Sequence, residues 1–298
     1  MVDEHRIKLF RLLLDLISKR NEVNTLSSCS SFVQDLLHLA RLNKVELEVA
    51  IRLGVRDEAS RLLDKYVRVV RLACAVSRVL GRYGVKFAFF KFLRPVRYVP
   101  SDVDLLIHVD HVKTAVKALC MLGFRVEVVE PFTVTLRCGE YVVDVYVHPC
   151  VAGSVCYLNG EVLLEHVYHV DMCDINVPCL RPYAEAIVVT AHALYKEHIV
   201  TLNDYLTFKK WFDDRAEKLS RELKCEAAIK YMRSLVDLVE KGCLVLPYRL
   251  PLAHAVQLAI DKVCKDSLTR STLLLSVSKL RDRRLLNQVV VHLTRETY

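Results

Sequence analysis

The chain has 298 residues, of which 53% are hydrophobic and 26% charged, so it can bury a sizeable core and is not a disordered protein. Its eight glycines and eight prolines exclude collagen-like chains, disfavour loop-rich all-β folds and favour a helix-rich chain. The net charge of +8 is spread along the sequence, which permits an anionic partner such as a nucleotide or RNA.

Targeting signals and cysteines point to the cytoplasm. No run of about 18 residues lacks charge, so we expect no transmembrane helix and no membrane partner. The charged N-terminal segment does not resemble a signal peptide, and the eleven cysteines therefore indicate reduced thiols, with disulfides as an open alternative. The spacing of the nearest metal-like group fits no common zinc site, so we interpret its members as ordinary buried residues: His166, His169, Cys173 and Cys179.

Helical patterns fill roughly the first 80 residues. Ile7, Phe10 and Leu13 recur at helical spacing, and the segment 31–34 has the form of a capping box that opens a second helix. An apolar stripe then runs from Leu62 to Leu80 and predicts a long helix that stops at Gly81 and Gly84.

The pattern then changes to short β-forming runs. We predict strands at 85–90, 102–109, 125–130, 133–138 and 141–149, with a two-proline loop after the first and a helix at 111–122. From about Pro182 the pattern is helical again. The sequence therefore predicts an α+β protein in which a small mixed β-sheet core, 83–170, is flanked by an N-terminal helical region, 1–82, and a C-terminal helical domain, 171–298.

Three aspartates stand out within the predicted strands. Asp102 and Asp104 are two apart, so their carboxylates leave the same face of one strand, and Asp144 lies in the middle of another. A lone Asp-x-Asp pair usually caps a strand or faces solvent, but a third strand-borne acid favours a site. If the strands are neighbours, the carboxylates repel one another unless a divalent cation such as Mg²⁺ or Mn²⁺ neutralises them. Metals held in this way suit an in-line displacement at phosphorus.

The segment from Val85 to Pro149 resembles the nucleotidyltransferase superfamily of the polymerase-β type, the small archaeal and bacterial members in particular. The resemblance rests on VPSDVDLLI at 99–107, on VVDVYVHP at 142–149 and on Gly123-Phe124 after the intervening helix. It implies a nucleotidyltransferase-like core, with Asp102, Asp104 and Asp144 as metal ligands and catalytic residues and an NTP as substrate.

One departure from that family concerns phosphate binding. The family carries Gly-Ser or Gly-Gly after its first strand, whereas FFKFL at 89–93 contains no glycine. Lys91, Arg94, Arg97 and Ser101 are the substitutes we expect to bind the triphosphate, since cationic side chains bind phosphate oxygens. The alternative is that these are solvated loop residues.

Further candidates are weaker. His148 shares a face with Asp144, and we interpret it as a strand end, with proton transfer as the alternative. His192, Lys196 and Glu197 are expected on a solvated helix face, with Lys196 reaching phosphate as the alternative. Three aromatic residues recur at helical spacing beside two lysines: Phe208, Trp211 and Phe212. We interpret them as core packing with basic residues at its edge, and the alternative is that they stack on RNA bases.

The leading hypothesis is therefore a cytoplasmic, magnesium- or manganese-dependent enzyme that transfers an NMP from ATP or another NTP to an acceptor hydroxyl and releases pyrophosphate. The acceptor class stays open between a small molecule, a protein and RNA, and so does the oligomeric state. The second hypothesis is a non-catalytic nucleotide- or RNA-binding module on the same fold, of a regulatory or toxin–antitoxin kind. A third is a helical scaffold in which the Asp-x-Asp pair is incidental.

Overall fold

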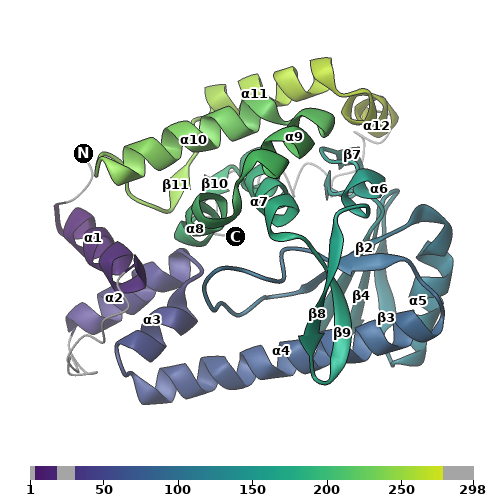
Figure 1. Cartoon of the computed structure of the whole chain (residues 1–298), viewed down its shortest axis with the longest axis horizontal. Coiled ribbons are helices and arrows are strands. Elements are labelled where there is room, and N and C mark those ends of the chain that lie inside the picture. The colour runs from purple at the N-terminus through teal and green to yellow at the C-terminus, as the bar shows by residue number, and fades with distance from the viewer. Residues whose placement is uncertain (1–3, 19–30, 278–298) are drawn as a thin grey trace.

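Helices from both ends of the chain enclose a mixed sheet in the computed structural model, which describes residues 4–18 and 31–277 (Figure 1). Four helices form the N-terminal region: α1 (Glu4–Ser18), α2 (Ser31–Leu42), α3 (Glu46–Arg52) and α4 (Arg56–Arg82). The long α4 ends where Gly81 and Gly84 predict, and it runs beneath the sheet in the view of Figure 1. The predicted capping-box helix begins at Ser31.

Seven strands make the main sheet, in the order β3-β4-β5-β2-β1-β9-β8. They are β1 (Phe87–Phe89), β2 (Val103–Ile107), β3 (Arg125–Val129), β4 (Thr133–Cys138), β5 (Tyr141–Tyr146), β8 (Val167–Met172) and β9 (Ile175–Leu180). Two neighbouring pairs, β2 with β5 and β1 with β9, run parallel, and the other pairs are antiparallel. The turn η1 (Val109–His111) and helix α5 (Val112–Met121) connect β2 to β3.

One short helix and a small hairpin lie between β5 and β8, and the other C-terminal helices follow β9. The helical elements are α6 (Gly160–Leu163), α7 (Pro182–Ala191), the π-helical η2 (His192–Glu197), α8 (Leu202–Trp211), α9 (Asp214–Glu222), α10 (Glu226–Glu240), α11 (Leu252–Lys265) and α12 (Ser267–Val277). The small strand pairs are β6 (Cys150–Val151) with β7 (Val155–Cys156), and β10 (Ile199–Val200) with β11 (Tyr248–Arg249).

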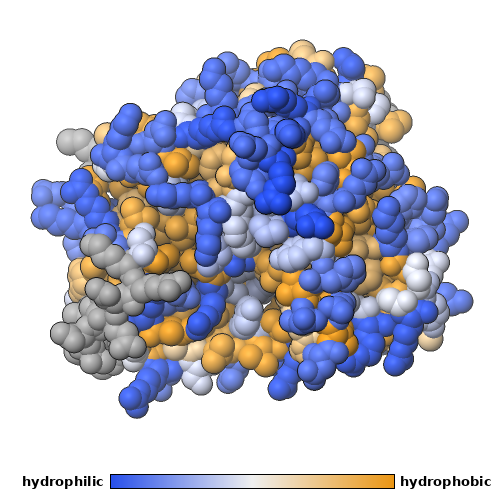
Figure 2. All heavy atoms as spheres, viewed as in Figure 1, coloured by the Kyte–Doolittle hydropathy of each residue, from blue (hydrophilic) through white to orange (hydrophobic). Residues whose placement is uncertain are grey.

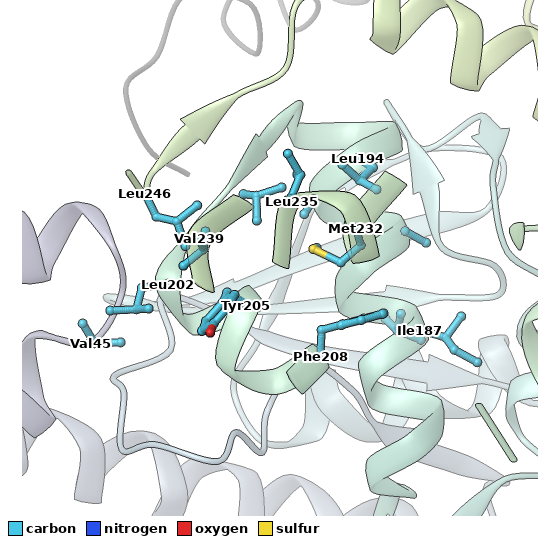
Figure 3. Close-up of a cluster of buried hydrophobic side chains, with 14 of the residues drawn as sticks. Val45, Ile187, Leu194, Leu202, Tyr205, Phe208, Met232, Leu235, Val239 and Leu246 are labelled. Atoms are coloured by element: carbon cyan, nitrogen blue, oxygen red, sulfur yellow. The ribbon is translucent and has the colours of Figure 1, made fainter. Parts of the chain in front are cut away.

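Two hydrophobic cores hold these layers together. One fills the space between α4, α5 and the sheet, where Val76, Leu105 and Val145 are almost fully buried. The other joins the N-terminal helices α1–α3 to the C-terminal helices in a single cluster. Figure 3 shows part of this second core, with Val45 from the N-terminal region close to Leu202 of α8. The two ends of the chain therefore fold onto one another, with the sheet to one side.

The expected fold class and each predicted strand of the core are present. The sheet contains two further strands, β8 and β9, the second of which lies beyond the predicted boundary at residue 170; the division into three domains stays a prediction. The disulfide alternative left open for the cysteines is present at one pair, Cys150 and Cys156 across the β6–β7 hairpin, while the other described cysteines are free thiols.

The structure also bears on the expected aromatic core group and on the expected absence of a membrane-spanning helix. Phe208 is buried and stacks on Phe212 with ring centroids 4.6 Å apart, in line with a core role. Among the described residues, no helix is both long and apolar enough to cross a membrane. On the face drawn in Figure 2, hydrophilic side chains cover much of the surface with hydrophobic ones between them.

Candidate active site

The strand register brings the three aspartates together. Asp104 of β2 and Asp144 of β5 are direct partners on adjacent parallel strands, and Asp102 immediately precedes β2. One carboxylate oxygen of each lies within 4.8 Å of the others. The alternation of a β-strand explains the arrangement, since Val103 and Val143 point into the core while the acids leave the opposite face. The convergence predicted from the sequence is therefore present.

Each carboxylate has a different environment. Asp104 is buried, and the ammonium of Lys91 lies 2.7 Å from its Oδ2. Asp144 is half-buried and accepts a hydrogen bond of 2.5 Å from Thr135 Oγ1. Asp102, also half-buried, accepts one of 3.1 Å from Ser101 Oγ. The three acids thus differ in exposure to water: Asp104 is buried in an ion pair, whereas Asp102 and Asp144 are partly exposed.

Burial and neighbouring carboxylates favour a proton on two of these acids, Asp104 and Asp144. Burial raises the pKa of Asp104 to about 6, and Asp102 and Asp144 add to the rise while Lys91 opposes it. Burial also raises the pKa of Asp144, against the hydrogen bond from Thr135. The arrangement is therefore short of positive charge at neutral pH, even with a lysine in place.

The residues fit a divalent metal ion. Three carboxylates supply hard oxygen ligands of the kind that Mg²⁺ and Mn²⁺ take. Oδ1 of Asp104 is buried and has no hydrogen-bond partner among the described residues. A buried carboxylate oxygen without a partner is costly, and a cation would satisfy it.

Lys91 lies in the loop after β1, in which the sequence departs from the resembling family by having no glycine. Its backbone has φ of 55°, the left-handed region that favours glycine, and its carbonyl accepts a hydrogen bond from Tyr98 Oη. Burial alone would lower the pKa of Lys91, but Asp104 and Asp102 together raise it above its ordinary value. Lys91 therefore carries a positive charge against the acids, from a backbone conformation that glycine ordinarily adopts.

A two-lobed cleft surrounds the aspartates. The first lobe, of about 570 Å³, lies between the N-terminal helices and the β1–β2 loop. The second lobe, of about 340 Å³, lies over β4, β5 and the β6–β7 hairpin. Asp104 lines only the first lobe and Asp144 only the second, whereas five residues line both: Lys44, Lys91, Ser101, Asp102 and His192. The Asp102 carboxylate thus lies at the junction of the two lobes.

The expected phosphate-binding residues divide between cleft and surface. Lys91 and Ser101 line both lobes, and Arg94 lines the first, with its guanidinium 5.7 Å from the centre of the Tyr98 ring. Arg97 is exposed and lines neither lobe. The structure therefore brings three of the four residues to the aspartates, and their binding of a triphosphate stays a prediction.

The expectation of a solvated face for the π-helical segment is wrong. His192 and Glu197 are buried, and both line the cleft together with Lys196. Burial and the neighbouring Lys91 hold the pKa of His192 well below its ordinary value, so its ring is neutral. Its Nε2 then donates to Glu197 Oε1 at 3.1 Å, and its Nδ1 accepts from Tyr157 Oη at 3.1 Å. Sequence spacing alone missed the burial of these residues, for which the largely apolar run before them, Ala186–Ala191, was the available sign.

Two weaker candidates lie outside the cleft. His148 Nδ1 accepts a hydrogen bond of 2.9 Å from the Gly160 amide, which is a structural role at the end of a strand. Among the described residues, the groups that could hold a metal do not include His166, His169 or Cys173. Their interpretation as buried residues holds for Cys179 alone, because His169 and Cys173 are exposed and His166 is half-buried.

Comparison with known proteins gives structural neighbours only. No family model and no curated protein matches the chain. The lincomycin-bound lincosamide antibiotic adenylyltransferase LnuA is 17% identical, with a TM-score of 0.32, over 44% of this chain and 89% of its own. The antibiotic-resistance factor ANT(2'')-Ia, whose structure was solved in solution, is 12% identical, with a TM-score of 0.34, over 59% of this chain and 93% of its own.

Because both TM-scores are low, we derive the function from the site itself.

Proposed function

We propose that the protein is a metal-dependent nucleotidyltransferase, which moves an NMP group from an NTP to an acceptor hydroxyl and releases pyrophosphate. The observation that carries the proposal is the convergence of Asp102, Asp104 and Asp144 at the junction of two lobes. A transfer between two substrates needs two compartments that meet at the reacting atom, and this cleft has that form.

The first lobe suits the nucleotide. Lys91 and Arg94 line it beside the aspartates and offer charge-assisted hydrogen bonds to phosphate oxygens. A divalent ion on the three carboxylates would neutralise the phosphate oxygens during the displacement. Ser101, at the junction, offers a hydroxyl to the same group.

The second lobe suits the acceptor. Asp144 lines it, and in this proposal its carboxylate accepts the proton of the attacking hydroxyl. Lys196, also in this lobe, has its pKa lowered to about 8 by burial and by Lys91, although the aspartates favour its charged form. Lys196 thus keeps a cation beside the acids while substrates exchange.

Label transfer tests the proposal. The protein is incubated with each α-labelled NTP, with Mg²⁺ or Mn²⁺ and with a cell lysate, and the labelled molecule is identified. Metal-dependent labelling of an acceptor with release of pyrophosphate supports the proposal, and the labelled molecule names the acceptor class. Absence of label and of pyrophosphate release under every condition contradicts it.

The second candidate is a nucleotide- or RNA-binding module without turnover. It is favoured by the missing glycine loop and by the Lys91–Asp104 ion pair, which occupies part of the carboxylate set. It predicts metal-dependent NTP binding with no pyrophosphate release in the same assay.

A further inference from the structure

One residue of the N-terminal region reaches the junction of the cleft. Lys44 lies in the turn between α2 and α3, far in sequence from the aspartates, yet it lines both lobes. Of the five residues that do so, the other four belong to the β1–β2 connection or to the π-helical segment. The N-terminal helices therefore contribute a cation at the point where the two lobes meet.

The turn that carries Lys44 is fixed from both ends of the chain. Asn43 is fully buried, and its Nδ2 donates to the carbonyls of Leu39 and Leu246, both at 3.0 Å. Its Oδ1 accepts from the Leu202 amide at 2.8 Å. Figure 3 shows the apolar packing next to these Asn43 hydrogen bonds, where Val45 lies close to Leu202.

Lys44 itself is held in a conformation that lysine seldom adopts. Its φ is 57°, and its carbonyl accepts a hydrogen bond of 3.2 Å from Asn203 Nδ2. A non-glycine residue in the left-handed region persists only where the surroundings fix it, and such residues cluster at functional sites. Lys91, the other lysine that lines both lobes, shares this conformation with φ of 55°.

The charge around Lys44 favours an anion. Arg41 and Arg61 at the rim of the first lobe already pair with Glu46 and Glu58. Lys91 and Arg94 lie close enough to Lys44 to lower its pKa, while Asp204 and Asp102 favour its charged form. A phosphate chain with several oxygens offers acceptors to Lys44, Lys91 and Arg94 together, beside a metal ion on the aspartates. Burial lowers the pKa of Lys44 to about 8, with Asp204 favouring its charged form, so the ammonium is charged at neutral pH.

We infer that Lys44 binds the phosphate chain of the nucleotide at the junction of the lobes, so that the N-terminal helical region is part of the active site. The inference rests on the proposed function and deepens it, because it assigns to residues outside the α/β core the phosphate binding that the missing glycines would otherwise supply.

Binding of inorganic tripolyphosphate with Mg²⁺, followed by calorimetry, tests the inference without a known base or acceptor. Lys44→Asn removes the ammonium and keeps a residue that tolerates the left-handed region. Lys224→Asn is the matched control, because Lys224 also has a positive φ, of 52°, in an interhelical turn, and lines neither lobe. We expect Lys44→Asn to weaken binding about ten- to a hundredfold, Lys44→Arg to retain most of the affinity, and Lys224→Asn to leave it unchanged.

The wild-type protein provides a second readout that does not depend on the folding of a variant. Tripolyphosphate with Mg²⁺ should protect Lys44, but not Lys224, from a lysine-acylating reagent, as read by peptide mass spectrometry. A purely structural Lys44 would give a lower melting temperature for Lys44→Asn with unchanged tripolyphosphate affinity and no protection, and that result overturns the inference. If label transfer proceeds in the wild type while Lys44 shows no effect, the inference alone fails. If neither transfer nor tripolyphosphate binding occurs, both proposals fail.

Discussion

At the scale of single residues, the site is a balance between the aspartates and the nearby lysines, of which Lys91 pairs directly with Asp104. Asp104 carries the highest cost, because burial and two neighbouring carboxylates disfavour its charge. The ammonium of Lys91 compensates at 2.7 Å, from a backbone position that normally needs glycine. The same charge balance predicts how the protein responds to mutation and to pH.

Replacing Lys91 by Met should destabilise the metal-free protein and make it depend on metal. Removing one partner of a buried ion pair costs about 3–5 kcal/mol, since the Asp104 carboxylate would be left without its cation. Urea unfolding with and without Mn²⁺ measures the effect, and we expect Mn²⁺ to recover a large part of the lost free energy of unfolding. An equal loss in both conditions would show that the carboxylates do not hold a metal.

Divalent-ion binding should weaken as the pH falls through about 6. The pKa of Asp104 is raised to about 6, so below that pH a proton occupies the carboxylate that the metal needs. The affinity for Mn²⁺ should fall by about tenfold between pH 7 and pH 5. Because the folded-state pKa lies above the unfolded one, the metal-free protein should also lose stability as pH rises from about 4 to 6.

Mn²⁺ titrations at several pH values, with Asp104→Asn as the comparison, check this pH dependence. The variant should bind weakly at every pH and show a smaller pH step. A wild-type affinity that is flat between pH 5 and pH 7 would contradict the assignment of Asp104 as a ligand.

At the scale of elements, the alternation of side chains along a strand places apolar residues in the core and the aspartates in the cleft. Val143 and Val145 of β5 are buried in the core of the sheet, while Asp144 between them faces the cleft. Replacing Val145 by Phe should therefore overpack the core and lower the free energy of unfolding by about 1–3 kcal/mol. Val126→Phe on the edge strand β3 is the control, because Val126 is exposed, and it should change stability by less than about 0.5 kcal/mol. Chemical denaturation of both variants measures the difference, and equal effects would contradict the assigned strand faces.

The elements also show where prediction from the sequence stops. The core strands carry alternating or continuous apolar runs bounded by glycine or proline, so they are predictable, and with them the convergence of the three aspartates. The β8–β9 hairpin is not predictable in this way, because its two-residue turn, Cys173–Asp174, has positive φ at both positions without the usual glycine. The turns at Lys91 and Lys44 are unpredictable for the same reason, because both residues have a positive φ and neither is glycine. The burial of His192 and Glu197 depends on helices packing from distant parts of the chain, which local spacing does not report.

At the scale of the whole molecule, the two ends of the chain share one core and one wall of the cleft. Asn43 is the polar centre of that contact, with three hydrogen bonds, two of them to Leu202 and Leu246 in the C-terminal region. Its replacement by Ala leaves a buried amide and a buried carbonyl of that region without partners. We expect a loss of about 2–4 kcal/mol in the free energy of unfolding, measured by urea denaturation. A loss below about 0.5 kcal/mol would show that the contact does not hold the two ends together.

The position of the transferred phosphorus tests the proposed chemistry most directly. The wild-type protein and Asp144→Ala are given α-labelled and γ-labelled NTP in parallel, with Mg²⁺ and a lysate that contains the acceptor. A nucleotidyltransferase transfers the α label, releases the γ label as pyrophosphate and loses both reactions in Asp144→Ala. Transfer of the γ label to an acceptor, or full transfer of the α label by Asp144→Ala, would contradict a three-aspartate nucleotidyltransferase site.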